Sequence, residues 1–131
     1  MFGVNPKTKE IALQQRKKAG ILIQKVLLGE LGVRVALLDF PKDVEDISVK
    51  AAWHALCHFE ADEDIRAKDS LYAEEQDLFL HSISQTLISG EALPLNITNS
   101  YKKYYDEPLT PHSEGWRGFL ADMKSFLVFK K

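Results

Sequence analysis

The sequence predicts an all-α fold: a compact bundle of about four helices in a single helical domain over residues 1–131. Three observations support this prediction. Apolar residues recur at spacings of three and four along most of the chain, which is the pattern of amphipathic helices. Glycine, proline and capping residues fall between these runs, where helices begin and end. With 131 residues, 45% hydrophobic and 27% charged, the chain is large enough for one core.

The first helix is expected over residues 6–28. Asn5 can cap the free amides at its start, and Pro6 suits the first helical position because no hydrogen-bond donor is needed there. Gly29 is a typical helix end. Gly20, inside the helix, should cost about 1 kcal/mol relative to alanine.

An alternative is an α+β fold with a small hairpin at residues 21–40. Residues 21–28 and 33–40 could pair as two strands across the glycine-containing connection between them. Polar residues interrupt the first arm, however, and doubled leucines in both arms suit a helix better. We therefore favour the helix, followed by a short helical or extended connector over 33–40 that ends before Pro41.

A second helix is expected over residues 44–67. Because a helix turns by about 100° per residue, positions three and four apart share a face. The apolar face should meet the core, and it comprises Val49, Ala52, Trp53, Leu56 and Phe59. The opposite face carries His54 and His58 between small alanines. It should therefore either meet water or pack against a second neighbour.

His54, His58 and Asp62 follow one another on that second face at intervals of four residues. Two histidines at this spacing can hold one divalent metal ion, and a carboxylate one turn later can reach the same ion. Another helix would have to complete the site, and His81 and His112 are the candidates. The zinc-protease pattern is absent, because no glutamate follows the first histidine. We favour the alternative that both histidines are solvated or hydrogen-bonded residues on a polar face.

Cys57 lies between the two histidines, at the edge of the apolar stripe. A thiol beside a histidine can be a nucleophile or a metal ligand, but a free cysteine on a helix is more often a small buried group. We favour burial and assign no catalytic residue. The acidic run at 62–64 lacks the spacing and the glycine of a calcium loop, and it is expected to be the solvated end of the helix.

A third helix should begin after Asp69, which can cap it, and end at Gly90. His81 is expected on its solvated side. Its apolar stripe comprises Tyr72, Phe79, Leu80, Ile83 and Leu87.

The segment 91–112 is rich in turn-forming residues and precedes a last helix that opens between Thr110 and Ser113. Three tyrosines are interleaved with two lysines at 101–105, a composition that can stack bases and contact phosphates. Two lysines are too few, however, for us to expect nucleic acid as a partner. The last helix should contribute to the core or form half of a dimer interface. Its stripe comprises Trp116, Phe119, Leu120, Met123, Phe126 and Leu127.

The net charge of −2 is unevenly distributed along the chain. Residues 1–42 carry eight basic and three acidic side chains, whereas residues 43–92 carry three basic and twelve acidic ones. Such polarity suits self-association or a charged protein partner.

A cytoplasmic protein without membrane contact is expected. No apolar run is long enough to span a bilayer, the first residues lack the order of a signal peptide, and one cysteine excludes an intramolecular disulfide. No phosphate-binding glycine loop is present, so no cofactor-binding residue is predicted. We therefore predict a non-enzymatic protein-interaction or regulatory module that self-associates as a homo-oligomer. The alternative is a metal-binding helical bundle, or a metal-dependent enzyme, with a divalent ion at His54, His58 and Asp62.

Overall fold

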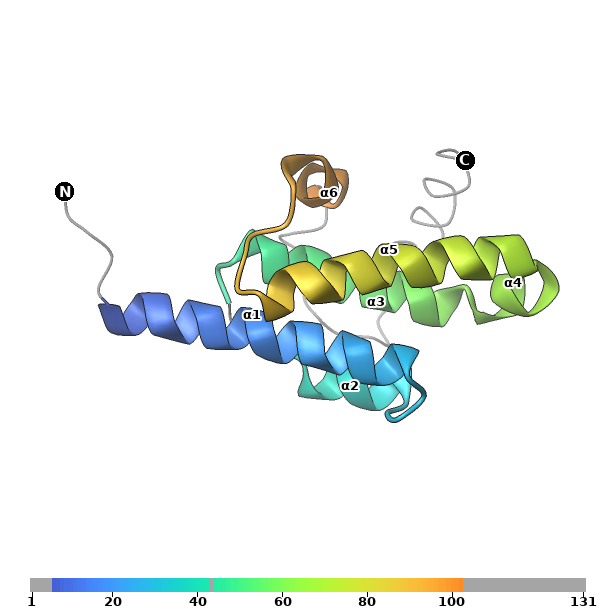
Figure 1. Ribbon diagram of the computed structural model, residues 1–131, viewed down its shortest axis with the longest axis horizontal. Coiled ribbons are helices and arrows are strands. Elements are labelled where there is room, and N and C mark those ends of the chain that lie inside the picture. Colours follow the sequence, from blue (N-terminus) through green and yellow to red (C-terminus); the bar gives the residue numbers. More distant parts are fainter. Residues whose placement is uncertain (1–5, 43, 103–131) are drawn as a thin grey trace.

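The computed structural model describes residues 6–42 and 44–102, and these form six helices without a strand (Figure 1). The all-α prediction is confirmed for this part of the chain, and the alternative hairpin at 21–40 is not supported. The predicted last helix, with its aromatic stripe, and His112 lie outside the described residues.

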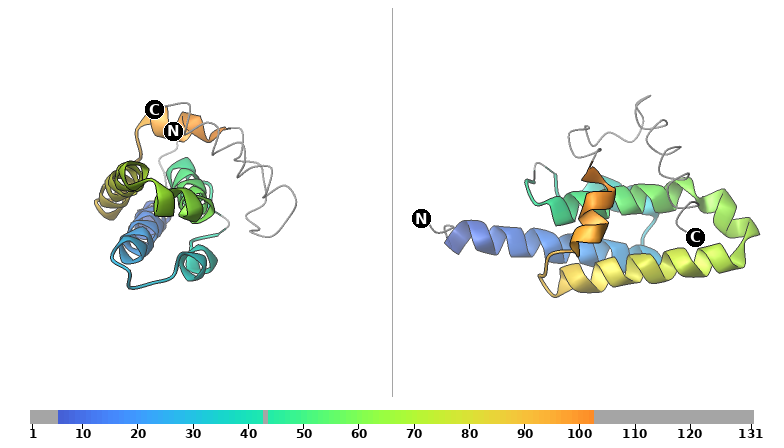
Figure 2. Two further views of the ribbon diagram at one scale, coloured as in Figure 1. Left: turned by 90° about the vertical axis from the view of Figure 1, so that its right-hand side faces the viewer. Right: turned by 90° about the horizontal axis from the view of Figure 1, so that it is seen from above.

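Two layers of helices enclose the core. The long helices α1 (Pro6–Leu27) and α5 (Ser70–Ile88) lie side by side in one layer and run in opposite directions. Figure 2 shows α2 (Val33–Asp39) and α3 (Ile47–Ala61) on the other side of the molecule. The short α4 (Glu63–Lys68) joins α3 to α5, and α6 (Leu95–Ser100) packs on α3.

Local sequence signals explain where the helices begin and end. α1 ends at Leu27, and Gly29 follows with φ of 75°, a left-handed conformation that glycine adopts without strain. The side chain of Asp69 accepts a hydrogen bond from the amide of Tyr72 (3.0 Å) and so caps α5, which ends just before Gly90 with φ of 82°. These boundaries agree closely with the predicted ones.

Two predictions about the elements need correction. The segment 44–67 is not one helix, because α3 ends at Ala61 and α4 starts at Glu63, with Asp62 between them in a non-helical conformation (φ −94°, ψ 14°). The segment predicted to be turn-rich contains α6, which follows Pro94. The open choice for the connector over 33–40 is resolved as the helix α2.

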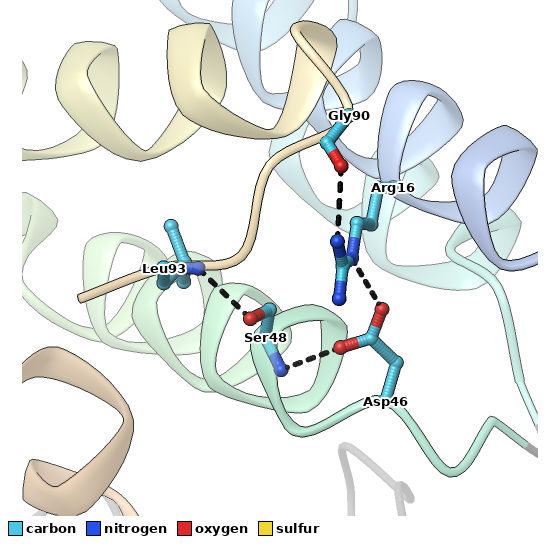
Figure 3. A network of polar contacts seen from close by, with 5 residues as sticks. All are labelled: Arg16, Asp46, Ser48, Gly90 and Leu93. Carbon is cyan, nitrogen blue, oxygen red and sulfur yellow. Dashed lines mark hydrogen bonds and ion pairs between the residues drawn. The ribbon is translucent and has the colours of Figure 1, made fainter. Parts of the chain in front are cut away.

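Arg16, in the middle of α1, links this helix to the start of α3 and to the end of α5 (Figure 3). Asp46 caps α3 by accepting a hydrogen bond from the Ser48 amide (2.9 Å), and its other oxygen lies 2.6 Å from Nε of Arg16 in α1. Arg16 also donates to the carbonyl oxygen of Gly90 (2.9 Å), just after α5. The Ser48 hydroxyl accepts from the amide of Leu93 (2.9 Å), which positions the chain leading to α6.

α1 and α5 approach each other closely at Gly20. The hydroxyl of Ser84 donates a hydrogen bond to the carbonyl oxygen of Gly20 (2.7 Å), and both residues are buried. A Cβ atom placed on Gly20 would lie 2.7 Å from the carbonyl oxygen of Ser84 and 2.9 Å from the amide nitrogen of Ile88. The absence of a side chain at this position therefore allows the two long helices to pack. None of the helices described is long and apolar enough to span a membrane.

Candidate functional site

α3 is buried on nearly every side. Its apolar stripe faces the core as predicted, with Trp53 and Leu56 almost fully buried. The opposite face is also buried, because α5 and α6 pack against the helix, and His54 and His58 have almost no exposed surface. The expectation of solvated histidines is therefore wrong. Of the two environments considered for this face, packing against a second neighbour is the one observed.

The two histidines have different environments. The ring of His54 stacks on that of Tyr101, which follows α6, with centroids 6.1 Å apart and planes 18° apart. Trp53 lies edge-on to the same imidazole at 5.4 Å. Nδ1 of His58 instead lies 2.8 Å from Oδ2 of Asp62, within ion-pair distance but without the direction of a hydrogen bond. In the part of the chain that the structure describes, Nε2 of His58 has no hydrogen-bond partner.

Asp62 lies at the centre of a polar cluster, which we call the Asp62 cluster. Its buried Oδ2 accepts a hydrogen bond from the hydroxyl of Tyr72 and a longer one from Nε2 of Gln76 (3.3 Å). Oε1 of Gln76 accepts in turn from Nη1 of Arg66 (3.0 Å). The Asp62 cluster thus comprises His58, Asp62, Arg66, Tyr72 and Gln76, and it joins α3, α4 and α5. Asp62 is buried, so the prediction that it lies at a solvated helix end is wrong.

Burial accounts for the electrostatics of the cluster. It raises the pKa of Tyr72, and the hydrogen bond and the negative charge of Asp62 raise it further, because both favour the protonated phenol. Burial lowers the pKa of Arg66, while the nearby carboxylate of Asp62 opposes that shift. Arginine stays protonated under such shifts, so the cluster places a positive charge one helical turn from the buried carboxylate.

The predicted metal ligands are only partly brought together. His58 and Asp62 are in contact, whereas His54 faces Tyr101 and Trp53, and His81 is exposed on α5. Among residues 6–42 and 44–102, no group of three or more histidine, cysteine, aspartate or glutamate side chains is arranged to hold a metal ion. Metal binding at His54, His58 and Asp62 therefore stays a prediction without support from the geometry.

Cys57 is fully buried, in agreement with the favoured interpretation. Burial raises its pKa well above the ordinary value for a thiol, and the charge of Glu60 adds to the shift. The reactive thiolate is thus disfavoured in the native protein, and the side chain is inaccessible. The structure gives Cys57 the character of a small packing residue.

Sequence reasoning missed the partners of Asp62. The helical spacing assigns Tyr72 to an apolar stripe, and its side chain is buried, but its hydroxyl donates a hydrogen bond to the carboxylate of Asp62. Gln76 lies four residues further along the same face of α5, and Arg66 lies four residues after Asp62. These i, i+4 spacings are the only features of the sequence that indicate which residues share a face with Asp62 or with Tyr72. They become informative only once the chain is known to reverse direction between α3 and α5.

Outside the core, large apolar side chains remain exposed on the long helices. On α1 and the turn that follows it, Ile21 and Leu28 are 42% and 64% exposed, and on α5, Leu71 and Leu78 are 67% and 64% exposed. Scattered surface leucines are ordinary, but pairs on one helical face mark a candidate interaction surface. No known protein family, curated protein or solved structure matches the chain.

Proposed function

We propose that the protein is a non-enzymatic interaction module that associates with further copies of itself. The observation that carries this proposal is the division of charge between two helical surfaces that also expose apolar side chains. α1 carries six lysine or arginine side chains and one acidic side chain, whereas α5 carries three acidic side chains and no lysine or arginine. Opposite charges on two surfaces of one chain favour contact between copies, in which each surface meets its complement.

The environment of the reactive side chains supports a binding role. The thiol of Cys57 and the imidazoles of His54 and His58 are buried. A general base or a nucleophile must come within hydrogen-bonding distance of its substrate. In the described part of the chain, these side chains are buried in the core and are not accessible to a substrate.

Sedimentation velocity on the full chain tests the proposal. We expect the sedimentation coefficient to rise as the concentration increases from low to high micromolar values at low ionic strength. Added salt should weaken the association, because it screens interactions between exposed charges. A monomer at every concentration and at both ionic strengths would refute self-association.

A further inference from the structure

The exposed face of α1 combines apolar and basic side chains. We call this surface the α1 stripe and define it as Lys17, Ile21, Lys25 and Leu28, which are exposed and lie three or four residues apart. The amide of Leu28 still donates to the carbonyl oxygen of Gln24 (2.9 Å), so the helical geometry extends to the end of the stripe. The stripe points away from Ala19 and Ile23, which are buried against the rest of the molecule.

The exposed face of α5 has the same pattern with the opposite charge. We call this surface the α5 stripe and define it as Leu71, Glu74, Glu75 and Leu78. It lies opposite the buried side of α5, which includes Tyr72 and Leu80.

The two stripes match in spacing as well as in charge. Seven residues separate the apolar members of each stripe, which corresponds to about 10.5 Å along a helix. If α1 and α5 of different copies pack in opposite directions, Ile21 meets Leu78 and Leu28 meets Leu71. Lys25 then lies opposite Glu74. In the parallel alignment of the same apolar pairs, Lys25 would lie opposite Glu75, so the charges alone are compatible with either orientation. The antiparallel orientation is favoured because it places the positive end of each helix dipole beside the negative end of the other helix.

We propose that the α1 stripe of one copy docks in antiparallel orientation on the α5 stripe of a second copy, with Lys25 beside Glu74. This inference rests on the proposed self-association and names the surfaces that carry it. A second copy is the occupant because one chain supplies both halves of the contact: apolar pairs at equal spacing, with basic residues on one stripe and acidic residues on the other. Contact between two single helical faces is small, so the association should be weak and sensitive to single charges.

Charge reversal of the full chain tests this contact. We expect Lys25→Glu and Glu74→Lys each to raise the Kd of self-association about fivefold to tenfold, because each replaces attraction by repulsion. The double variant Lys25→Glu with Glu74→Lys should recover the wild-type Kd. An equimolar mixture of the two single variants should also associate, since each supplies the complement of the other. Sedimentation equilibrium measures all four samples.

Lys9→Glu is the matched control, because it makes the same charge change at an exposed position of α1 outside the stripe. It should leave the Kd within about twofold of wild type. A wild-type monomer would contradict the proposed function itself. Self-association that neither single variant weakens would overturn only the pairing of the two stripes. The pairing would also be overturned if both single variants associated more weakly than wild type and neither the double variant nor the mixture recovered the wild-type Kd. Circular dichroism confirms that each variant is folded.

Discussion

Asp62 lies between the end of α3 and the start of α4, and its carboxylate is buried. A buried charge is costly unless donors and opposite charges surround it. Tyr72 and Gln76 supply donors, and His58 lies at ion-pair distance. Loss of any one of these partners leaves the carboxylate undersatisfied, so the Asp62 cluster should be sensitive to conservative changes.

Tyr72→Phe removes the hydroxyl that donates to Asp62 and keeps the buried ring. We expect the free energy of unfolding at neutral pH to fall by about 1–3 kcal/mol, the cost of removing a hydrogen-bond donor from a buried charged group. Urea denaturation followed by circular dichroism measures the change. Ser82→Ala, at an exposed position of the same helix, is the control and should have little effect. An equally stable Tyr72→Phe variant would show that the hydrogen bond contributes nothing net.

The difference in stability between the wild type and Tyr72→Phe should depend on pH. Because the pKa of Tyr72 is raised in the folded state, its contribution is fully present below about pH 10, the pKa of an unfolded tyrosine, and is lost as pH rises toward the folded value. The wild type should therefore lose stability relative to Tyr72→Phe above about pH 10. Urea denaturation of both proteins at pH 8 to 11 checks this. A difference in free energy of unfolding that stays constant over this range would contradict it.

At the scale of elements, Gly20 shows how a local rule can mislead. Helix propensity alone predicts that alanine would stabilise α1 here by about 1 kcal/mol. The structure places backbone atoms of Ser84 and Ile88 within 2.9 Å of the added Cβ atom. Backbone atoms cannot move aside unless the two long helices separate. The steric cost should therefore exceed the gain in propensity.

We expect Gly20→Ala to lower the free energy of unfolding by about 1–3 kcal/mol, which is the usual cost of overpacking. Urea denaturation measures the change. Gly32→Ser is the matched control, because a Cβ atom there meets no atom within 4 Å and serine is a good residue at the start of α2. A stabilised Gly20→Ala variant would mean that α1 and α5 can separate without cost.

Local signals predicted much of the fold. Gly29, Asp69 and Gly90 gave the end of α1 and the limits of α5, because caps and left-handed glycines act within one or two turns. The burial of Trp53 and Cys57 followed from the apolar stripe of α3. The environment of His54, His58 and Asp62 could not be predicted, since it depends on Tyr72 and Gln76 in α5 and on Tyr101 after α6. No periodicity within α3 encodes those contacts.

At the scale of the whole molecule, α3 is the element on which the others pack. It contacts α1, α2, α4, α5 and α6, and its side chains are buried from Ala51 to His58. A helix enclosed in this way should not become accessible through the local fraying that opens exposed helices. Its exposure should require unfolding of most of the described structure.

Cys57, in the middle of α3, can report on that unfolding. Its buried, protonated thiol should react with an aromatic disulfide reagent at least about a thousandfold more slowly in the native protein than in urea, because reaction requires a rare open state. Spectroscopy of the released thiolate measures the rate. Gly20→Ala and Tyr72→Phe should accelerate it about tenfold for each 1.4 kcal/mol of lost stability if opening is global. A fast native reaction, or variants that are less stable without reacting faster, would show that α3 opens locally.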